Sequence, residues 1–95
     1  MDRSELQSRR DEILAIARRH GAYDLRIFGS VARGDQTDRS DVDLLVHFEP
    51  HRSLMDHGML IEELRELLGI KVDVVDDEAM RIRFREQAMK EAIPL

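Results

Sequence analysis

Two aspartates stand at the start of a segment that otherwise has the composition of a buried strand. Asp41 and Asp43 lead into Leu44-Leu45-Val46 in the sequence DVDLLV. Because alternate residues of a strand point to the same face, these two carboxylates would lie close together and repel each other. Burial would also raise their pKa values. A divalent cation removes both problems, and magnesium prefers carboxylate and phosphate oxygens. The pair therefore predicts a magnesium site.

A third carboxylate could join this pair. Asp73 stands between Val72 and Val74 in the β-branched run IKVDVV. If this run forms a strand beside residues 41–48, Asp73 can lie on the same face as Asp41 and Asp43. Three carboxylates could then hold two metal ions about 3.5–4 Å apart, a spacing suited to in-line displacement at phosphorus. An aspartate at the end of a strand is also often structural, so both interpretations of Asp73 stay open.

A Gly-Ser turn precedes the aspartates and suggests what the metal would act on. Gly29 allows the backbone to approach a phosphate closely. Ser30 would begin a short helical turn over residues 31–33, where free N–H groups and a hydroxyl can bind anions. Arg33 follows in the segment VARG; it could contact a triphosphate or form a surface ion pair, for example with Asp35. The arrangement would direct the phosphates of a nucleotide toward the carboxylates.

The rest of the sequence predicts the elements that position these residues. Helical periodicity, capping residues and glycine stops indicate the helices, and β-branched or apolar runs indicate the strands. The expected elements are a helix over about 4–20 with an N-cap at Ser4, a strand over 23–28, the turn 31–33, a polar loop over 35–40, a strand over 41–48, a helix from the Ser53 cap to Gly69, a strand over 70–75 and a helix over about 77–91.

This order predicts an α/β (α+β) fold, in which a small mixed β-sheet packs against helices. The 95 residues suit a single domain over 1–95. The net charge of −5 argues against a general nucleic-acid coat protein, and the absence of cysteine excludes disulfides and thiolate zinc sites. The charged N-terminus is unlike a signal peptide, and no apolar run is long enough to span a membrane. We therefore expect a cytoplasmic protein.

The motifs together resemble a known superfamily. The segment Phe28-Gly29-Ser30 followed by Asp41-Val42-Asp43-Leu44 is similar to the signature of DNA-polymerase-β-like nucleotidyltransferases. The fuller run GSVARGDQTDRSDVDLLV resembles the minimal nucleotidyltransferase (MNT-domain) antitoxins, which are encoded beside HEPN toxins in prokaryotic toxin–antitoxin pairs. The resemblance covers nearly the whole chain, including the strand KVDVV and the closing EAIPL.

This resemblance implies the polymerase-β-like fold and a role for each motif residue. Gly29 and Ser30 match the phosphate-binding turn, and Arg33 matches a basic position near the triphosphate. Asp41 and Asp43 match the metal-binding carboxylates. Asp73 matches a third acidic position that belongs to the metal site and assists deprotonation of the attacking hydroxyl.

The resemblance also implies an activity and a partner. In such pairs the antitoxin uses ATP and Mg²⁺, two ions being expected, to transfer AMP to a tyrosine hydroxyl of the HEPN ribonuclease toxin. No direct contact with nucleic acid or membrane is implied, and a homo- or hetero-oligomer is possible. We expect no additional C-terminal domain of the kind found in larger relatives, which makes a small free acceptor or a nucleic-acid primer less expected.

Two other functions stay open at this point. A chain of this size could neutralise a toxin by occlusion alone, using apolar residues of the later helices as a binding module. It could also be a nucleotidyltransferase that modifies a small molecule. The basic residues Arg81, Arg83 and Arg85 are explained equally by a solvated helix face or by contact with a partner or nucleotide.

Overall fold

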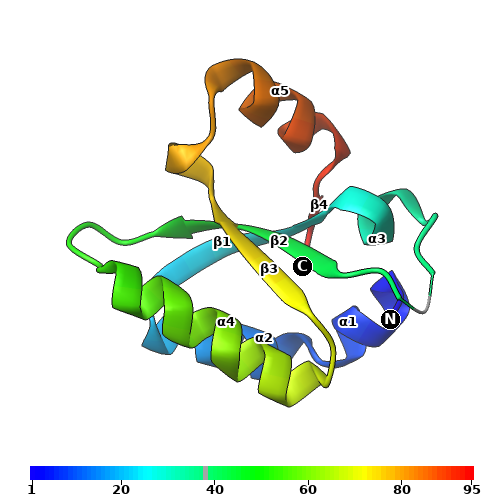
Figure 1. Cartoon of the computed structure of the whole chain (residues 1–95), viewed down its shortest axis with the longest axis horizontal. Helices are drawn as coiled ribbons and strands as arrows, with labels where there is room; N and C mark the ends of the chain where they lie inside the picture. The colour runs from blue at the N-terminus through cyan, green and yellow to red at the C-terminus, as the bar shows by residue number, and fades with distance from the viewer. Residues whose placement is uncertain (38) are drawn as a thin grey trace.

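A mixed sheet of four strands forms the centre of the part of the chain that the structure describes (Figure 1). The structure, a computed structural model, describes residues 1–37 and 39–95. The strands lie in the order β3-β2-β1-β4, with β2 antiparallel to β1, β2 parallel to β3, and β1 antiparallel to β4. Their bounds are Ala22–Phe28 (β1), Val42–Phe48 (β2), Val72–Asp76 (β3) and Ile93–Pro94 (β4). The expected α+β fold with a small mixed sheet is confirmed.

Helices lie on both sides of this sheet. α2 and α4 cover one face, and α5 passes over the other (Figure 1). The bounds are Arg3–Ser8 (α1), Arg10–Arg19 (α2), Gly29–Arg33 (α3), Leu54–Leu68 (α4) and Ile82–Glu91 (α5), with a 3₁₀ turn over Asp77–Ala79 (η1). Within the described residues, no helix is both long enough and apolar enough to cross a membrane.

The core explains why β2 is apolar at consecutive positions. Leu44 and Val46 are buried in the main cluster together with residues of α2 and α4. Leu45, between them, is also buried but lies outside that cluster, because alternate residues point to opposite faces of the sheet. The predicted burial of this strand on both faces is therefore confirmed, and Asp43 shares the face of Leu45.

The first predicted helix is wrong in its continuity and in its cap. The segment divides into α1 and α2 at Arg9, and the N-cap is Asp2, whose carboxylate accepts from Glu5 N at 2.8 Å. α1 ends at Ser8, whose hydroxyl donates to the Glu5 carbonyl at 2.6 Å. Arg9 then bonds Glu12 and the Leu67 carbonyl of α4. These local bonds compete with an unbroken helix.

The predicted C-terminal helix is also interrupted. Asp76 caps the 3₁₀ turn η1 by accepting from Glu78 N at 3.0 Å, and α5 begins only at Ile82. After α5 the chain adds the short strand β4, which the sequence did not predict. The Ser53 cap with its capping box and the Gly69 stop are confirmed. One residue of the predicted loop 35–40, Asp38, lies outside the described residues.

Candidate active site

A close contact joins the Gly-Ser turn to Asp43 of β2. Phe28, the last residue of β1, pairs with Asp43 of β2, so the chain turns into α3 directly above the Asp43 side chain. Gly29 has φ +74, and a Cβ built on it would lie 2.5 Å from Asp43 Oδ2. Glycine is therefore needed for both its conformation and its lack of a side chain. The turn and the carboxylate form one unit.

The parallel pairing of β2 and β3 brings the next carboxylate to the same place. Asp43 and Asp73 are register partners, and the neighbouring pairs Val42 with Val72 and Leu44 with Val74 face the core. Asp43 and Asp73 therefore share the opposite face. The condition set by the sequence, that the strand with Asp73 lie beside the strand with Asp43, is met.

The electrostatic surroundings of Asp43 disfavour the charged form of its carboxyl group. Partial burial raises its pKa, and the charges of Asp73 and Asp41 raise it further, against smaller opposing effects of Arg33 and Lys71. Like-charge repulsion at a partly desolvated carboxylate is the condition that a bound cation relieves. The electrostatics thus support the interpretation of this position as a cation ligand.

Basic side chains accompany the two outer carboxylates. Lys71 Nζ lies 3.6 Å from Asp41 Oδ2, and Arg65 Nη2 lies 3.7 Å from Asp73 Oδ1. Arg65 also donates to the Val72 carbonyl at 3.2 Å, which places its guanidinium at the open edge of β3. No group of three or more His, Asp or Glu side chains among residues 1–37 and 39–95 is arranged to hold a metal ion. The donors are hard oxygens that suit magnesium, but convergence of all three stays a prediction.

The short helix α3 carries the predicted phosphate-binding residues. It begins at Gly29 with no side-chain cap, so its first-turn N–H groups are not bonded by the residue that precedes them. Arg33 ends the helix and pairs with Asp35 at 3.2 Å and with Glu91 of α5 at 3.5 Å. The Asp35 hydrogen bond is the main cause that raises the pKa of Arg33. The ion pair considered for Arg33 is present, and its role toward a triphosphate stays a prediction.

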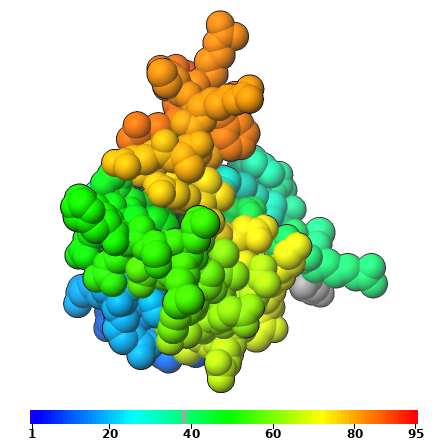
Figure 2. Space-filling model, turned by 60° about the vertical axis from the view of Figure 1, so that its left-hand side comes forward, coloured from blue at the N-terminus to red at the C-terminus, as the bar shows by residue number. Residues whose placement is uncertain are grey.

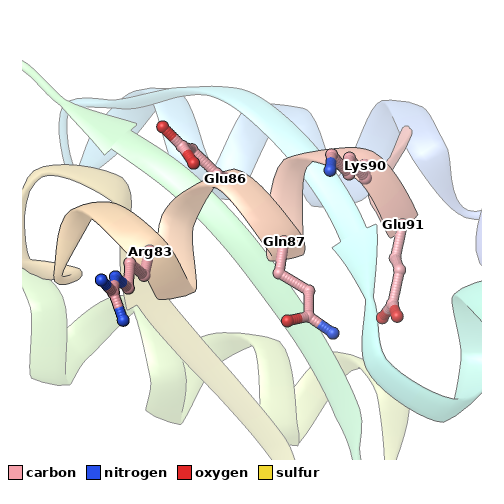
Figure 3. A pocket seen from close by; sticks show the side chains of 5 residues that line it. All are labelled: Arg83, Glu86, Gln87, Lys90 and Glu91. Atoms are coloured by element: carbon pink, nitrogen blue, oxygen red, sulfur yellow. The ribbon is translucent and has the colours of Figure 1, made fainter.

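Sequence reasoning missed the contribution of α5 to this site. A pocket of about 320 Å³ opens beside Gly29 and Arg33, and α5 supplies its other wall through Phe84, Gln87 and Glu91. A second pocket of about 420 Å³ lies along α5 itself and shares Gln87 and Glu91 with the first (Figure 3). The sequence signal was the helical spacing in the tail; it identified the helix but not the side of the sheet on which it lies.

The chain is similar in sequence to proteins of the nucleotidyltransferase domain family. A family model described as a nucleotidyltransferase domain matches residues 10–95. "Protein adenylyltransferase MntA" of Thermococcus cleftensis is 35% identical over 78 residues, covering 82% of this chain and 79% of the relative. The Methanocaldococcus jannaschii protein MJ0435, provisionally named a protein adenylyltransferase, is 38% identical over 82 residues, covering 86% of this chain and 88% of its own length.

Solved structures extend the comparison to the fold. A structure described provisionally as a minimal nucleotidyltransferase superposes with a TM-score of 0.90 at 49% identity, over 100% of this chain and 97% of its own. A toxin-antitoxin structure with AMP-PNP superposes with a TM-score of 0.76 at 22% identity, over 88% of this chain and 69% of the other. At that identity the second comparison supports the fold alone.

Proposed function

The chain belongs to the nucleotidyltransferase domain family, and from this premise we propose that it is an antitoxin that transfers AMP from Mg-ATP to a tyrosine hydroxyl of a partner HEPN ribonuclease toxin. The observation that carries the proposal is the unit formed by Gly29, Asp43 and Asp73: a glycine turn against one carboxylate, with a second carboxylate in register beside it. The names of the relatives as protein adenylyltransferases support the same reaction.

Each residue has a role in this proposal. The first turn of α3 and the Ser30 hydroxyl bind phosphate oxygens of ATP, and Arg33 neutralises part of the triphosphate charge. Asp41, Asp43 and Asp73 are the residues that would hold Mg²⁺. When bound, the ion would neutralise charge on the phosphates and orient the leaving group. The raised pKa of Asp43, caused first by burial and then by Asp73 and Asp41, fits such a ligand.

The reaction is a single in-line displacement. The tyrosine oxygen forms a bond to the α-phosphorus of ATP, the bond from that phosphorus to the bridging oxygen of the β-phosphate breaks, and pyrophosphate leaves. The hydroxyl proton passes to the Asp73 carboxylate and from there to solvent. Asp73 is suited to this because its side chain is 45% exposed at the edge of the sheet, where an acceptor can approach.

The test is the intact mass of a HEPN partner co-expressed with this protein. The proposal expects the toxin to gain the mass of one or more AMP groups, located on tyrosine by peptide fragmentation. The Asp41→Ala/Asp43→Ala double variant should leave the toxin unmodified while still being folded. An unmodified toxin with the wild-type protein, in cells or with purified Mg-ATP, would refute the proposal.

A second candidate function is occlusion of the toxin without chemistry. The observation that favours it is the exposure of large apolar side chains on two helices: Leu54 and Met55 of α4 are 89% and 72% exposed, and Ile82 of α5 is 77% exposed. In the space-filling view the segment around residue 80 projects from the body of the molecule, where a partner could contact it (Figure 2).

The same double variant separates the two functions. Under occlusion, Asp41→Ala/Asp43→Ala protein still co-purifies with the toxin and still rescues growth. Under adenylyl transfer, co-purification persists but rescue is lost. A Leu54→Ser/Met55→Ser variant is the complementary control, because these exposed positions can change with little effect on folding. Loss of co-purification in that variant, with transfer still measurable at high protein concentration, identifies α4 as a docking element.

A further inference from the structure

The pocket beside Gly29 has a composition that the phosphate-binding role does not explain. Arg33 of α3 and Glu91 of α5 pair with each other in its lining, and the rest of its wall from α5 is formed by Phe84, Gln87 and Ala88. A triphosphate would be bound by basic groups and N–H donors. An aromatic ring, a methyl group and an uncharged amide are instead the groups expected around a flat, uncharged, hydrogen-bonding ligand.

Phe84 is the first of these groups. Its side chain is 62% exposed although it is a large apolar residue, whereas Ala88, one turn further along α5, is buried at 7%. Phe84 therefore contributes little to the core and presents its ring to the pocket beside Gly29. Every nucleobase has a face that stacks on such a ring, so Phe84 can hold a base without choosing among bases.

Gln87 is the group that can distinguish one nucleobase from another. In Figure 3 its amide extends from α5 on the same side as Glu91, which pairs with Arg33, while Glu86 extends on the other side. A glutamine amide offers one donor and one acceptor side by side. Adenine presents an acceptor at N7 and a donor at N6 on one edge, which matches this pattern. Guanine presents two acceptors, N7 and O6, which match an arginine instead.

We propose that this pocket is the base subsite of the nucleotide, with Phe84 as the stacking residue and Gln87 as the residue that selects adenine over guanine. The proposal rests on the proposed function, because it needs the triphosphate at the adjoining turn of Gly29 and Ser30. It adds a specificity determinant on α5, outside the phosphate and carboxylate motifs. The volume of about 320 Å³ is within the range of pockets that hold small ligands.

The stacking role is tested by calorimetric titration of the full chain with ATP and, separately, with inorganic tripolyphosphate, both with MgCl₂. Phe84→Ala should weaken ATP binding by about 10-fold or more, leave tripolyphosphate binding unchanged, and be rescued by Phe84→Tyr. Ile82→Ala is the matched control: Ile82 is an exposed apolar residue of the same helix that does not line this pocket. Equal loss of both ligands, or no loss of ATP binding, would overturn the role.

The selection role is tested by the ratio of ATP to GTP affinity. Wild-type protein should prefer ATP, and Gln87→Arg should shift the ratio toward GTP by about 10-fold or more. Glu86→Gln changes the net charge by the same amount on the other side of α5 and should leave the ratio unchanged. A ratio unaffected by Gln87→Arg overturns the assignment of Gln87. Wild-type protein that binds neither ATP nor tripolyphosphate would instead refute the nucleotide part of the proposed function, which is a separate outcome.

Discussion

At the scale of single residues, two glycines with similar backbones provide a direct test of the contact at the turn. Gly29 and Gly34 have φ values of +74 and +79, but a Cβ on Gly34 would have no neighbour within 4 Å. Either change to alanine should cost about 1–2 kcal/mol of the free energy of unfolding, because an L side chain is disfavoured at such φ values. Only Gly29→Ala should also displace the Asp43 carboxylate.

Adenylyl transfer should therefore separate the two variants. Gly34→Ala is expected to keep most of the transfer rate, whereas Gly29→Ala should lose it by about 10-fold or more, since small misplacements of a reacting group have effects of that order. The measurements are chemical denaturation and a transfer assay on the same preparations. Similar transfer rates in the two variants would show that the contact of Gly29 with Asp43 is unimportant.

Asp43 is expected to oppose stability while serving the reaction. Its charge is partly desolvated and lies near those of Asp73 and Asp41, so the metal-free protein retains repulsion at this point. Asp43→Asn should raise the midpoint of thermal unfolding in EDTA and lower adenylyl transfer by at least about 100-fold, because even the outer partners of metal ligands are worth 10–100-fold. Adding MgCl₂ should stabilise the wild type more than the variant. An unchanged or lower midpoint for the variant in EDTA would contradict this.

The residue scale also shows what the sequence could reveal. Asp73 could join Asp43 only if their strands became neighbours, but the face of the sheet on which Asp43 lies was predictable from strand alternation. The ion pairs of Lys71 with Asp41 and Arg65 with Asp73 were not, because they depend on side chains meeting across a strand edge. The choice between an ion pair and a phosphate contact for Arg33 likewise depended on Glu91, which is 58 residues away in the chain.

At the scale of elements, one ion pair connects the short helix α3 to α5. Arg33 Nη1 lies 3.5 Å from Glu91 Oε2. The Glu91 carboxylate therefore competes with a triphosphate for the guanidinium of Arg33. Glu91→Gln should remove this competition and strengthen binding of inorganic tripolyphosphate several-fold, since each exposed ion pair is worth up to about 1 kcal/mol. Titration with tripolyphosphate measures it. The same change in an Arg33→Ala background should have no effect; an equal gain there would show that Glu91 acts on the anion directly.

Another pair connects β2 to η1 and predicts a dependence of stability on pH. His47 Nδ1 lies 2.8 Å from Asp77 Oδ1, and this hydrogen bond is the main cause that raises the pKa of His47 above 6.5. A raised pKa means that the folded protein binds the proton more tightly. The stabilisation is therefore fully present below pH 6.5 and is lost as the pH rises through the higher folded value.

The Asp77→Asn variant tests this contribution; it also removes the contact of Asp77 Oδ2 with Arg85 Nη2 at 3.9 Å, which does not depend on the charge of His47. The wild type should unfold at a higher temperature than the variant at about pH 6, and the difference should narrow as the pH rises through the raised pKa of His47. Thermal unfolding at the two pH values gives the comparison, and NMR titration of His47 should show a lower pKa in the variant. A temperature difference that stays constant or grows with pH would exclude the pair as its source.

The predicted helices were correct where capping residues and hydrophobic periodicity agreed. They were wrong where side-chain hydrogen bonds competed with a continuous helix. α4 begins after the Ser53 cap and ends before Gly69 as predicted, because both signals act within a single turn. The helix over 4–20 was broken at Arg9 by hydrogen bonds of Ser8 and Arg9, one of which reaches α4. β4 could not be predicted from two residues, since it is held by groups far away in the chain: it pairs with β1, and the Pro94 carbonyl accepts from Gln7 Nε2 at 3.3 Å.

At the scale of the whole molecule, the sheet order decides which parts of the site are present together. The sheet has the strand order β3-β2-β1-β4, with Asp43 beside Asp73. The sequence alone could not predict this order or this register, because no local signal specifies which strands become neighbours. The helical tail was predicted, but its path across the sheet, from η1 to β4, was not. That path places α5 beside α3, so the pocket at Gly29 is a product of the tertiary fold.

The place of β3 at the edge of the sheet has a consequence for how the site forms in time. Gly29 directly follows β1, and Asp43 lies in β2, the antiparallel neighbour of β1 and close to it in the chain. Asp73 arrives only after α4 has crossed and β3 has paired in parallel with β2. Non-local parallel pairing is slow and edge strands open easily. We expect amide hydrogens of β3 to exchange faster than those of β2, as mass spectrometry would show. The half of the site that binds phosphate would then persist in partly opened molecules that have lost Asp73, so binding of ATP should survive brief openings that interrupt catalysis.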